Sequence, residues 1–461
     1  MASELSLTAA PIPKLIKLVS LPVMVGFFFN TMFNVVDTYF GGQVSTEALA
    51  ALTFSFPVFF LIIIFDAGTS TGITALIANL IGAKQTDLVH RYAAQSVSFA
   101  LVLSLFLTLA GLAFSPALFR LLGAEGTTLA LALEYMDVIF YGSVCFMLLS
   151  VFNAFLQAAG DTRTYRNFLI VGFFLNVLLD PWFLYGGFGL PALGFRGIAL
   201  ATILIQIAGV LYLYRQVVRV DFIAQVSLRD FVPDMQIFRE IARQAVPASL
   251  NLATIGVGIF IITHFIAGFG ENAVAAYGIA TRIEQIALLP TIGLTIACLT
   301  IVGQNNGAKQ FDRVRETFRL CLWYGLTIMA VGSVLVFFLS GTLMEFFTAD
   351  ADVANIGSHY LKIAAFIFLA YAILFVAVSL LQGMKRPVYP VAIGLYRQIL
   401  APVLVFPLLT TALGLGIDGV WWGIFGITWS AAIITLLYAW RVLDRCLTIA
   451  PPHAIVSGRE G

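Results

Sequence analysis

Among the carboxylates that lie inside long apolar runs of this sequence, where an acidic side chain has few structural uses, four are candidates for chemistry. They are Asp37, Asp66, Asp180 and Glu284. If the runs cross a lipid bilayer, an ionised side chain at the centre costs at least about 2.5–3.5 kcal/mol on insertion scales. Such residues are candidates for function, and the chemistry open to them is reversible protonation or binding of a small cation.

Asp37 and Asp180 each have an amide at helical spacing. Asn34 precedes Asp37 by three residues and Asn176 precedes Asp180 by four, which places each pair on one helix face. We predict that these faces look into protein or water, and that the two carboxylates form one proton or cation site with Asn34 and Asn176. An internally hydrogen-bonded structural pair is the alternative.

Further polar side chains follow in neighbouring apolar runs. Asn153 with Gln157, and Thr202 with the glutamine four residues later, either extend the same network or form ordinary hydrogen bonds between helices. Asp66 precedes a stretch of small residues, 67–72, so it either joins the proton site or accepts hydrogen bonds from hydroxyls nearby.

The second half of the chain has fewer such groups. We expect Glu284 to pair with Arg397, or Arg282 with a backbone carbonyl, in contacts that hold this half together. His264 is alone in its apolar run, and we expect a hydrogen-bonded core histidine rather than a proton relay.

Composition places most of the chain in lipid. The 461 residues are 60% hydrophobic and 11% charged, with a mean hydropathy of +0.98, outside the range of water-soluble domains. A net charge of +1 gives no sign of a nucleic-acid partner. The four cysteines lack metal-ligand spacing. We therefore expect no metal and no cofactor.

Apolar runs of about 20 residues, enough to cross a bilayer, recur along the chain. They lie near residues 14–40, 47–81, 91–119, 127–155, 164–186, 194–218, 238–269, 273–302, 314–346, 353–382, 388–412 and 418–441. We predict an all-α integral membrane protein with twelve transmembrane helices. Most lysines and arginines fall on the side of the termini, and the opposite side has only Arg120, Arg196 and Lys362. This bias predicts that both termini are cytoplasmic.

An internal repeat divides the chain. The sequence Gly-Ala-Lys-Gln at residues 82–85 recurs at 307–310, a shift of 225. We predict two pseudo-symmetric six-helix bundles around a central cleft, an N-terminal lobe over residues 1–222 and a C-terminal lobe over 223–461, joined by a cytoplasmic linker. The shift carries Asp37 onto Ile262 and Asp180 onto Val405. The carboxylate pair is therefore confined to the first lobe.

These segments resemble the multidrug and toxic compound extrusion (MATE) transporters, particularly their DinF-like branch. The resemblance covers nearly the whole chain and is carried by residues 21–22, 34–37, 156–161 and 176–181 together with the repeat. It implies coupling carboxylates at Asp37 and Asp180, assisted by Asn176, Asn153 and Thr202, and a bend of the first helix at Pro22. Asp66 departs from the pattern, where a small or neutral residue is expected.

The resemblance implies a secondary active exporter rather than an enzyme. We expect antiport of organic, often cationic and amphipathic compounds against H⁺ through protonation of the N-lobe aspartates. Na⁺ coupling is one alternative. A lipid-linked oligosaccharide flippase is another, although only Arg282 and Arg397 could hold its pyrophosphate. We expect a monomer in the bacterial inner membrane, with small organic molecules and membrane lipids as partners.

Overall fold

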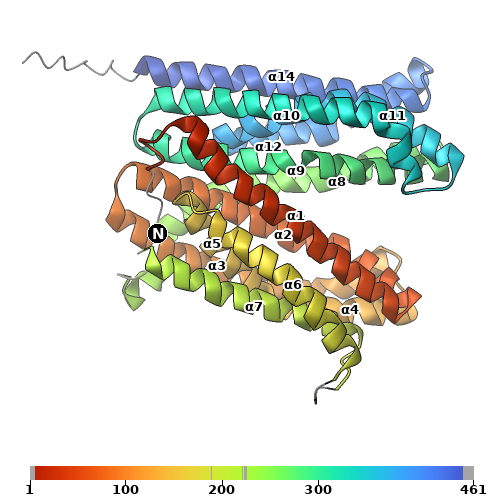
Figure 1. Ribbon diagram of the computed structural model, residues 1–461, viewed down its shortest axis with the longest axis horizontal. Coiled ribbons are helices and arrows are strands. Elements are labelled where there is room, and N and C mark those ends of the chain that lie inside the picture. Colours follow the sequence, from red (N-terminus) through yellow and green to blue (C-terminus); the bar gives the residue numbers. More distant parts are fainter. Residues whose placement is uncertain (1–5, 188, 190, 221, 223–225, 450–461) are drawn as a thin grey trace, which may run out of the picture.

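Long helices account for most of the computed structural model, which describes residues 6–187, 189, 191–220, 222 and 226–449. Figure 1 shows them in two bundles that lie side by side. The first bundle contains α1 (Ile12–Val44), α2 (Thr46–Gly82), α3 (Thr86–Leu121), α4 (Gly126–Tyr141), α5 (Ser143–Ala158), α6 (Arg163–Tyr185) and α7 (Phe195–Arg219). The second contains α8 (Met235–Ala267), α9 (Glu271–Gly307), α10 (Phe311–Glu345), α11 (Ala351–Gly383), α12 (Val388–Leu395), α13 (Ala401–Pro407) and α14 (Ile417–Ile449).

The predicted number of membrane-spanning helices is confirmed within the described residues. Eleven helices are long and apolar enough to cross a membrane, and the bent pair α4 and α5 brings the number to twelve. The fourth predicted span, 127–155, is thus broken, with a bend of 47° at Gly142. The span Val388–Ala412 is also irregular, because it contains π-helical turns at Tyr396–Leu400 and Leu408–Ala412, next to prolines that cannot donate a backbone hydrogen bond.

The repeated Gly-Ala-Lys-Gln sequence forms the same turn twice. Lys84 and Lys309 adopt the left-handed backbone conformation, with φ of 57° and 58°. In both copies the following glutamine N–H reaches back to close the helix, from Gln85 to Leu80 O and from Gln310 to Asn305 O, at 3.1 and 2.8 Å. This is the Schellman ending of a helix. Identical turns 225 residues apart agree with duplication.

The N-terminal segment packs against the second bundle. The backbone carbonyl of Leu7 accepts from Asn305 at 3.1 Å, and that of Ala10 accepts from Arg313 at 2.7 Å. Leu7 is buried in a core cluster with Ile301 of α9. The start of the chain therefore ties the two bundles together.

The linker between the bundles is only partly described. The boundary predicted between residues 222 and 223 falls where 221 and 223–225 lie outside the described residues. Residues 1–5 and 450–461 lie outside them as well, so the predicted cytoplasmic position of both termini stays a prediction.

Candidate functional site

The two predicted carboxylates lie together at one depth of the first bundle. Asn176 of α6 donates its Nδ2 to Asp37 Oδ1 of α1 across 2.8 Å. Asp180, one turn further along α6, lies beside both. Asn176 and Asp180 are fully buried, whereas Asp37 is half-buried. α1 and α6 run alongside each other and place the three side chains.

The oxygens of this cluster are incompletely satisfied. Neither oxygen of Asp180 has a hydrogen-bond partner, and Asn176 Oδ1 has none either. Buried polar atoms are almost always hydrogen-bonded, so three unpartnered oxygens in one place need an explanation. A bound proton or small cation would supply the missing partner.

Other residues predicted for this network are placed differently. Asn34 is exposed and donates its Nδ2 to the backbone carbonyl of Asn30 at 2.9 Å, so it does not reach Asp37. Thr202 of α7 is buried, but its hydroxyl donates to Ile198 O of the same helix at 3.2 Å.

One neighbour of the pair was not singled out from the sequence. Tyr135 of α4 is buried near both Asp37 and Asp180 and packs on Phe195, with ring centroids 5.4 Å apart. No spacing marked it, because the chain contains 15 tyrosines and 41 phenylalanines, most of which pack helices or face lipid. Only its position across the bundle distinguishes it.

A second polar location lies further along α1. Pro22 of α1 and Asn153 and Gln157 of α5 line a pocket of about 10 Å³, enough for a water-sized sphere. Pro22 precedes Asp37 by 15 residues, about 22 Å along a helix. The single network expected from the sequence is therefore divided into two groups at different depths of the bundle. The helical period of 3.6 residues shows which side chains share a face of one helix, but it does not show which helix faces pack together.

Asp66 belongs to neither location. The Ser150 hydroxyl of α5 donates to the Asp66 backbone carbonyl at 3.3 Å, while Asp66 Oδ1 is buried without a partner. Tyr165 also lies near it. The structure does not bring Asp66 to the Asp37–Asp180 pair. The hydroxyl contact goes to its backbone carbonyl, so it does not confirm the alternative role for the carboxylate either.

Two expectations for the second bundle are wrong. Glu284 and Arg397 form no ion pair. Among the described residues, the ion pairs within 4 Å are Arg91–Asp234 and His359–Asp418. Arg397 lies in the first π-helical turn, and its guanidinium stands over the Tyr371 ring, 5.4 Å from the centroid. His264 is exposed in the last turn of α8 and is not a core residue.

The two bundles meet at the end that carries the Gly-Ala-Lys-Gln turns. Asn79 of α2 donates to the carbonyl of Gly383 at 2.8 Å, and Gln304 of α9 donates to the carbonyl of Ala158 at 2.7 Å. Each residue in one bond lies 225 positions from its counterpart in the other. The structure therefore contains a pseudo-symmetric contact between the bundles, here called the interlobe contact.

Two glycines make this close approach possible. A Cβ added at Gly82 would lie 1.8 Å from Gln304 O, and one at Gly307 would lie 1.9 Å from Asn79 O. No side chain fits at such distances. Glycine at both positions is a packing requirement of the interlobe contact.

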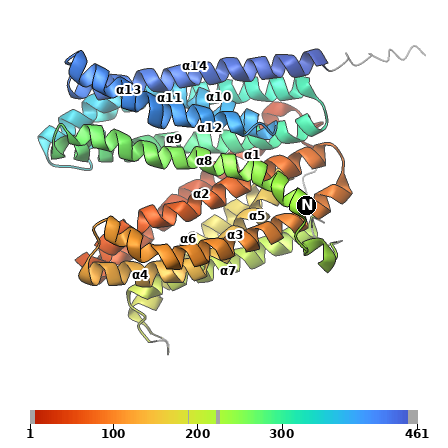
Figure 2. The same cartoon turned by 180° about the vertical axis from the view of Figure 1, so that it is seen from behind.

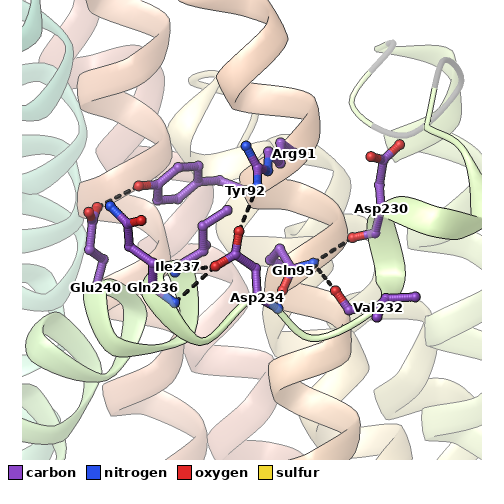
Figure 3. Close-up of polar contacts among 9 residues, drawn as sticks. All are labelled: Arg91, Tyr92, Gln95, Asp230, Val232, Asp234, Gln236, Ile237 and Glu240. Atoms are coloured by element: carbon purple, nitrogen blue, oxygen red, sulfur yellow. Dashed lines mark hydrogen bonds and ion pairs between the residues drawn. The ribbon is translucent and has the colours of Figure 1, made fainter.

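The linker is fastened to α3, as Figure 3 shows. Gln95 Nε2 donates to the carbonyls of Asp230 and Val232 at 2.6 and 2.7 Å, and its Oε1 accepts from Asp234 N at 2.8 Å. Asp234 also pairs with Arg91 at 2.6 Å. These bonds fix the start of α8 on the first bundle.

Asp234 is the N-cap of α8. Its Oδ1 accepts from the backbone N–H of Gln236 at 2.9 Å and of Ile237 at 3.4 Å. The bond from Gln236, with smaller contributions from Ile237 and Arg91, holds the pKa of the Asp234 carboxyl below its ordinary value despite some desolvation. The cap is therefore built for the ionised form.

Comparison with protein-family models gives one match. The model described as MatE matches residues 22–182 and again residues 247–406. The two matched stretches fall on the two bundles, as duplication requires, and together they cover more than half of the chain.

Known proteins agree in sequence and in fold. The chain is 27% identical over 387 residues to a probable multidrug resistance protein, YoeA, of Bacillus subtilis, covering 83% of each chain. It is 29% identical over 421 residues to an FAD transporter of Shewanella oneidensis, covering 90% of each. A solved structure described as the outward-facing conformation of a multidrug resistance MATE family transporter superposes with a TM-score of 0.88 at 25% identity, covering 96% of this chain and 98% of that one.

Proposed function

Because the chain belongs to the MatE family, we propose that it is a secondary active exporter that exchanges organic compounds for protons bound at the Asp37–Asp180 pair. The compounds are small organic molecules, often cationic and amphipathic. Similarity to multidrug resistance proteins over most of the chain supports this class of substrate.

The observation that carries the proposal is the group of unpartnered oxygens on α6. Asp180 is buried with two free oxygens, and Asn176 uses its donor on Asp37. A proton on Asp180 supplies the O–H that the free Asn176 oxygen lacks. Both residues lie on α6, so proton binding and release make and break a hydrogen bond beside the Asn176–Asp37 bond that joins α6 to α1.

α1 provides a route from this bond to the other bundle. Asp37 lies near one end of α1. Near the other end, α1 packs closely on α9, because a Cβ added at Gly293 of α9 would lie 2.6 Å from Ser20 O. Pro22 lies between these points and lacks a backbone donor, which makes α1 easier to bend there. A change of bonding at Asp37 can therefore alter how α1 packs on α9.

The orientation of the cycle follows from the charge bias. With the Gly-Ala-Lys-Gln turns on the cytoplasmic side, the interlobe contact closes the cytoplasmic end, and likeness to an outward-facing structure agrees with this. Export requires that this contact open to admit a compound from the cytoplasm. We place the chain in a bacterial inner membrane with both termini cytoplasmic, as a monomer.

Na⁺ is the alternative coupling ion, since the same three oxygens could contact it. Efflux of a cationic dye from proteoliposomes distinguishes the two. We expect an imposed pH gradient without Na⁺ to drive efflux and a Na⁺ gradient at equal pH to drive none. Efflux under the Na⁺ gradient alone would overturn proton coupling and leave the exporter assignment intact.

A further inference from the structure

A pocket of about 540 Å³ lies outside the machinery described so far. It is lined by residues of α8, the turn between α11 and α12, and α14, together with Leu76 of α2 in the first bundle. Figure 2 shows α8, α12 and α14 in the same bundle. Its size is within the range of pockets that hold small molecules. The lining residues used below are Glu240, Arg243, Lys385, Arg386, Val388 and Tyr438.

Positive charge dominates the lining. Arg243, Lys385 and Arg386 are exposed, and Glu240 is the one acidic side chain that lines the pocket. Glu240 Oε2 accepts from the Tyr92 hydroxyl at 2.5 Å, so this carboxylate is held toward α3 (Figure 3). The three cations therefore have no close acidic partner within 4 Å in the described part of the chain.

The positive charge of this pocket is not repeated at the equivalent positions of the first bundle. The positions 225 residues before Arg243, Lys385 and Arg386 are Leu18, Gly160 and Asp161. Leu7 fills that place, since its Cδ1 lies 3.1 Å from where a Gly160 Cβ would be. The cluster of cations is therefore specific to the second bundle and is not part of the repeat.

The pocket borders the lipid-facing surface. Val388 lines it and is 70% exposed, and Leu437, next to Tyr438 on α14, is 56% exposed. Apolar side chains exposed on membrane-spanning helices contact acyl chains. Lys385 and Arg386 lie on the side that the charge bias assigns to the cytoplasm, at the level of phospholipid headgroups.

We propose that this pocket binds the phosphate of an anionic phospholipid of the cytoplasmic leaflet, held by Arg243, Lys385 and Arg386 with the acyl chains along Val388. Arg and Lys bind phosphate oxygens through charge-assisted hydrogen bonds. Three cations would repel a cationic exported compound, so the occupant that this pocket favours is an anion. The lipid bridges α8 to the α11–α12 turn.

Melting of the purified full chain in neutral detergent tests the proposal. The probes are phosphatidylglycerol, phosphatidylcholine and glycerol 3-phosphate. We expect phosphatidylglycerol to raise the melting temperature, and the other two to leave it unchanged at the same concentration. Equal stabilisation by phosphatidylcholine would overturn the charge recognition, and equal stabilisation by glycerol 3-phosphate would overturn the lipid as its source.

Matched variants locate the effect. In K385Q/R386Q the half-saturating concentration of phosphatidylglycerol should rise about 30-fold, because each cation near an anionic lipid is worth about 1 kcal/mol. K84Q/K309Q is the control, because Lys84 and Lys309 do not line the pocket. They lie in turns like that of Lys385, since the φ angles of Lys84, Lys309 and Lys385 are 57°, 58° and 58°.

A second variant keeps the proposal testable if the first variant does not fold. If K385Q/R386Q does not fold, R243Q removes a cation from α8 without touching the turn, and we expect about fivefold weaker binding by the same conversion. Unchanged binding in a folded K385Q/R386Q, or in R243Q where only that variant folds, would overturn the assignment of the site.

Discussion

Asn176 and Asp180 lie one turn apart on α6, yet only Asn176 bonds to Asp37, at 2.8 Å. Asp180 is buried with both oxygens free. The two carboxylates are therefore unequal. Asp37 already has a donor from the protein, and Asp180 has none.

Asp180→Asn should uncouple efflux from the pH gradient. Each coupled proton supplies about 1.4 kcal/mol per pH unit, a tenfold concentration ratio, and the amide cannot take up a proton. We expect the accumulation ratio of dye in proteoliposomes to fall about tenfold per imposed pH unit. Asp66→Asn is the control and should keep its coupling, because Asp66 lies away from the pair. Normal pH-driven efflux by Asp180→Asn would remove the proposed site.

Asn176→Ala should weaken the packing of α1 on α6. The change leaves Asp37 without its donor, and a hydrogen bond to a charged group is worth about 1.5–3 kcal/mol. We expect a lower melting temperature and slower efflux. Thr38→Ala removes an exposed hydroxyl that bonds only within α1, to Asn34 O at 2.9 Å, and should change stability by less than about 0.5 kcal/mol. Equal effects of both variants would contradict the role of Asn176.

Gly82→Ala and Gly307→Ala should prevent the interlobe contact from closing. The added methyl would lie within 2 Å of a backbone carbonyl of the other bundle, at 1.8 and 1.9 Å. Spin labels across the contact should report longer distances, and efflux should be lost. Gly332→Ala on α10, where a Cβ meets nothing within 4 Å, is the control and should gain about 0.5–1 kcal/mol. Unchanged distances in both Gly82→Ala and Gly307→Ala would show that the interlobe contact tolerates a side chain.

Asp234 makes the start of α8 sensitive to acid. Its pKa is lowered in the folded protein, chiefly by the backbone N–H of Gln236, so its stabilising effect is full above the unfolded pKa of about 3.9 and is lost as the pH falls through the folded value. The melting temperature of Asp234→Ala should therefore lie below that of the natural chain at pH 6 and approach it below about pH 4. Arg91→Gln keeps both backbone bonds and should have a smaller effect. A constant difference down to pH 3 would contradict this assignment.

The fold was accessible from the sequence because its signals are long or repeated. Runs of about 20 apolar residues leave little choice of structure in lipid. The turns at Lys84 and Lys309 repeat letter for letter. The bend at Gly142 was missed because the apolar run continues unbroken through it.

The site was accessible only in part. Helical spacing correctly joined Asn176 to Asp180, since both lie on one face of one helix. It could not say which face meets which, so Asn34 appeared equivalent to Asn176 although it faces away. The pairing of Glu284 with Arg397 was wrong because sequence spacing could not show that Arg397 stands over the Tyr371 ring. Tyr135 required the three-dimensional arrangement.

The bonds from Asn305 and Arg313 to the first residues have a consequence for assembly. The Asn305 amide is 298 positions from the Leu7 carbonyl it holds. Residues 7–10 leave the ribosome long before these partners and can bind them only after α9 and the start of α10 have been synthesised. This attachment must then form late in biogenesis. A chain truncated before residue 305 would lack both bonds that hold residues 7–10.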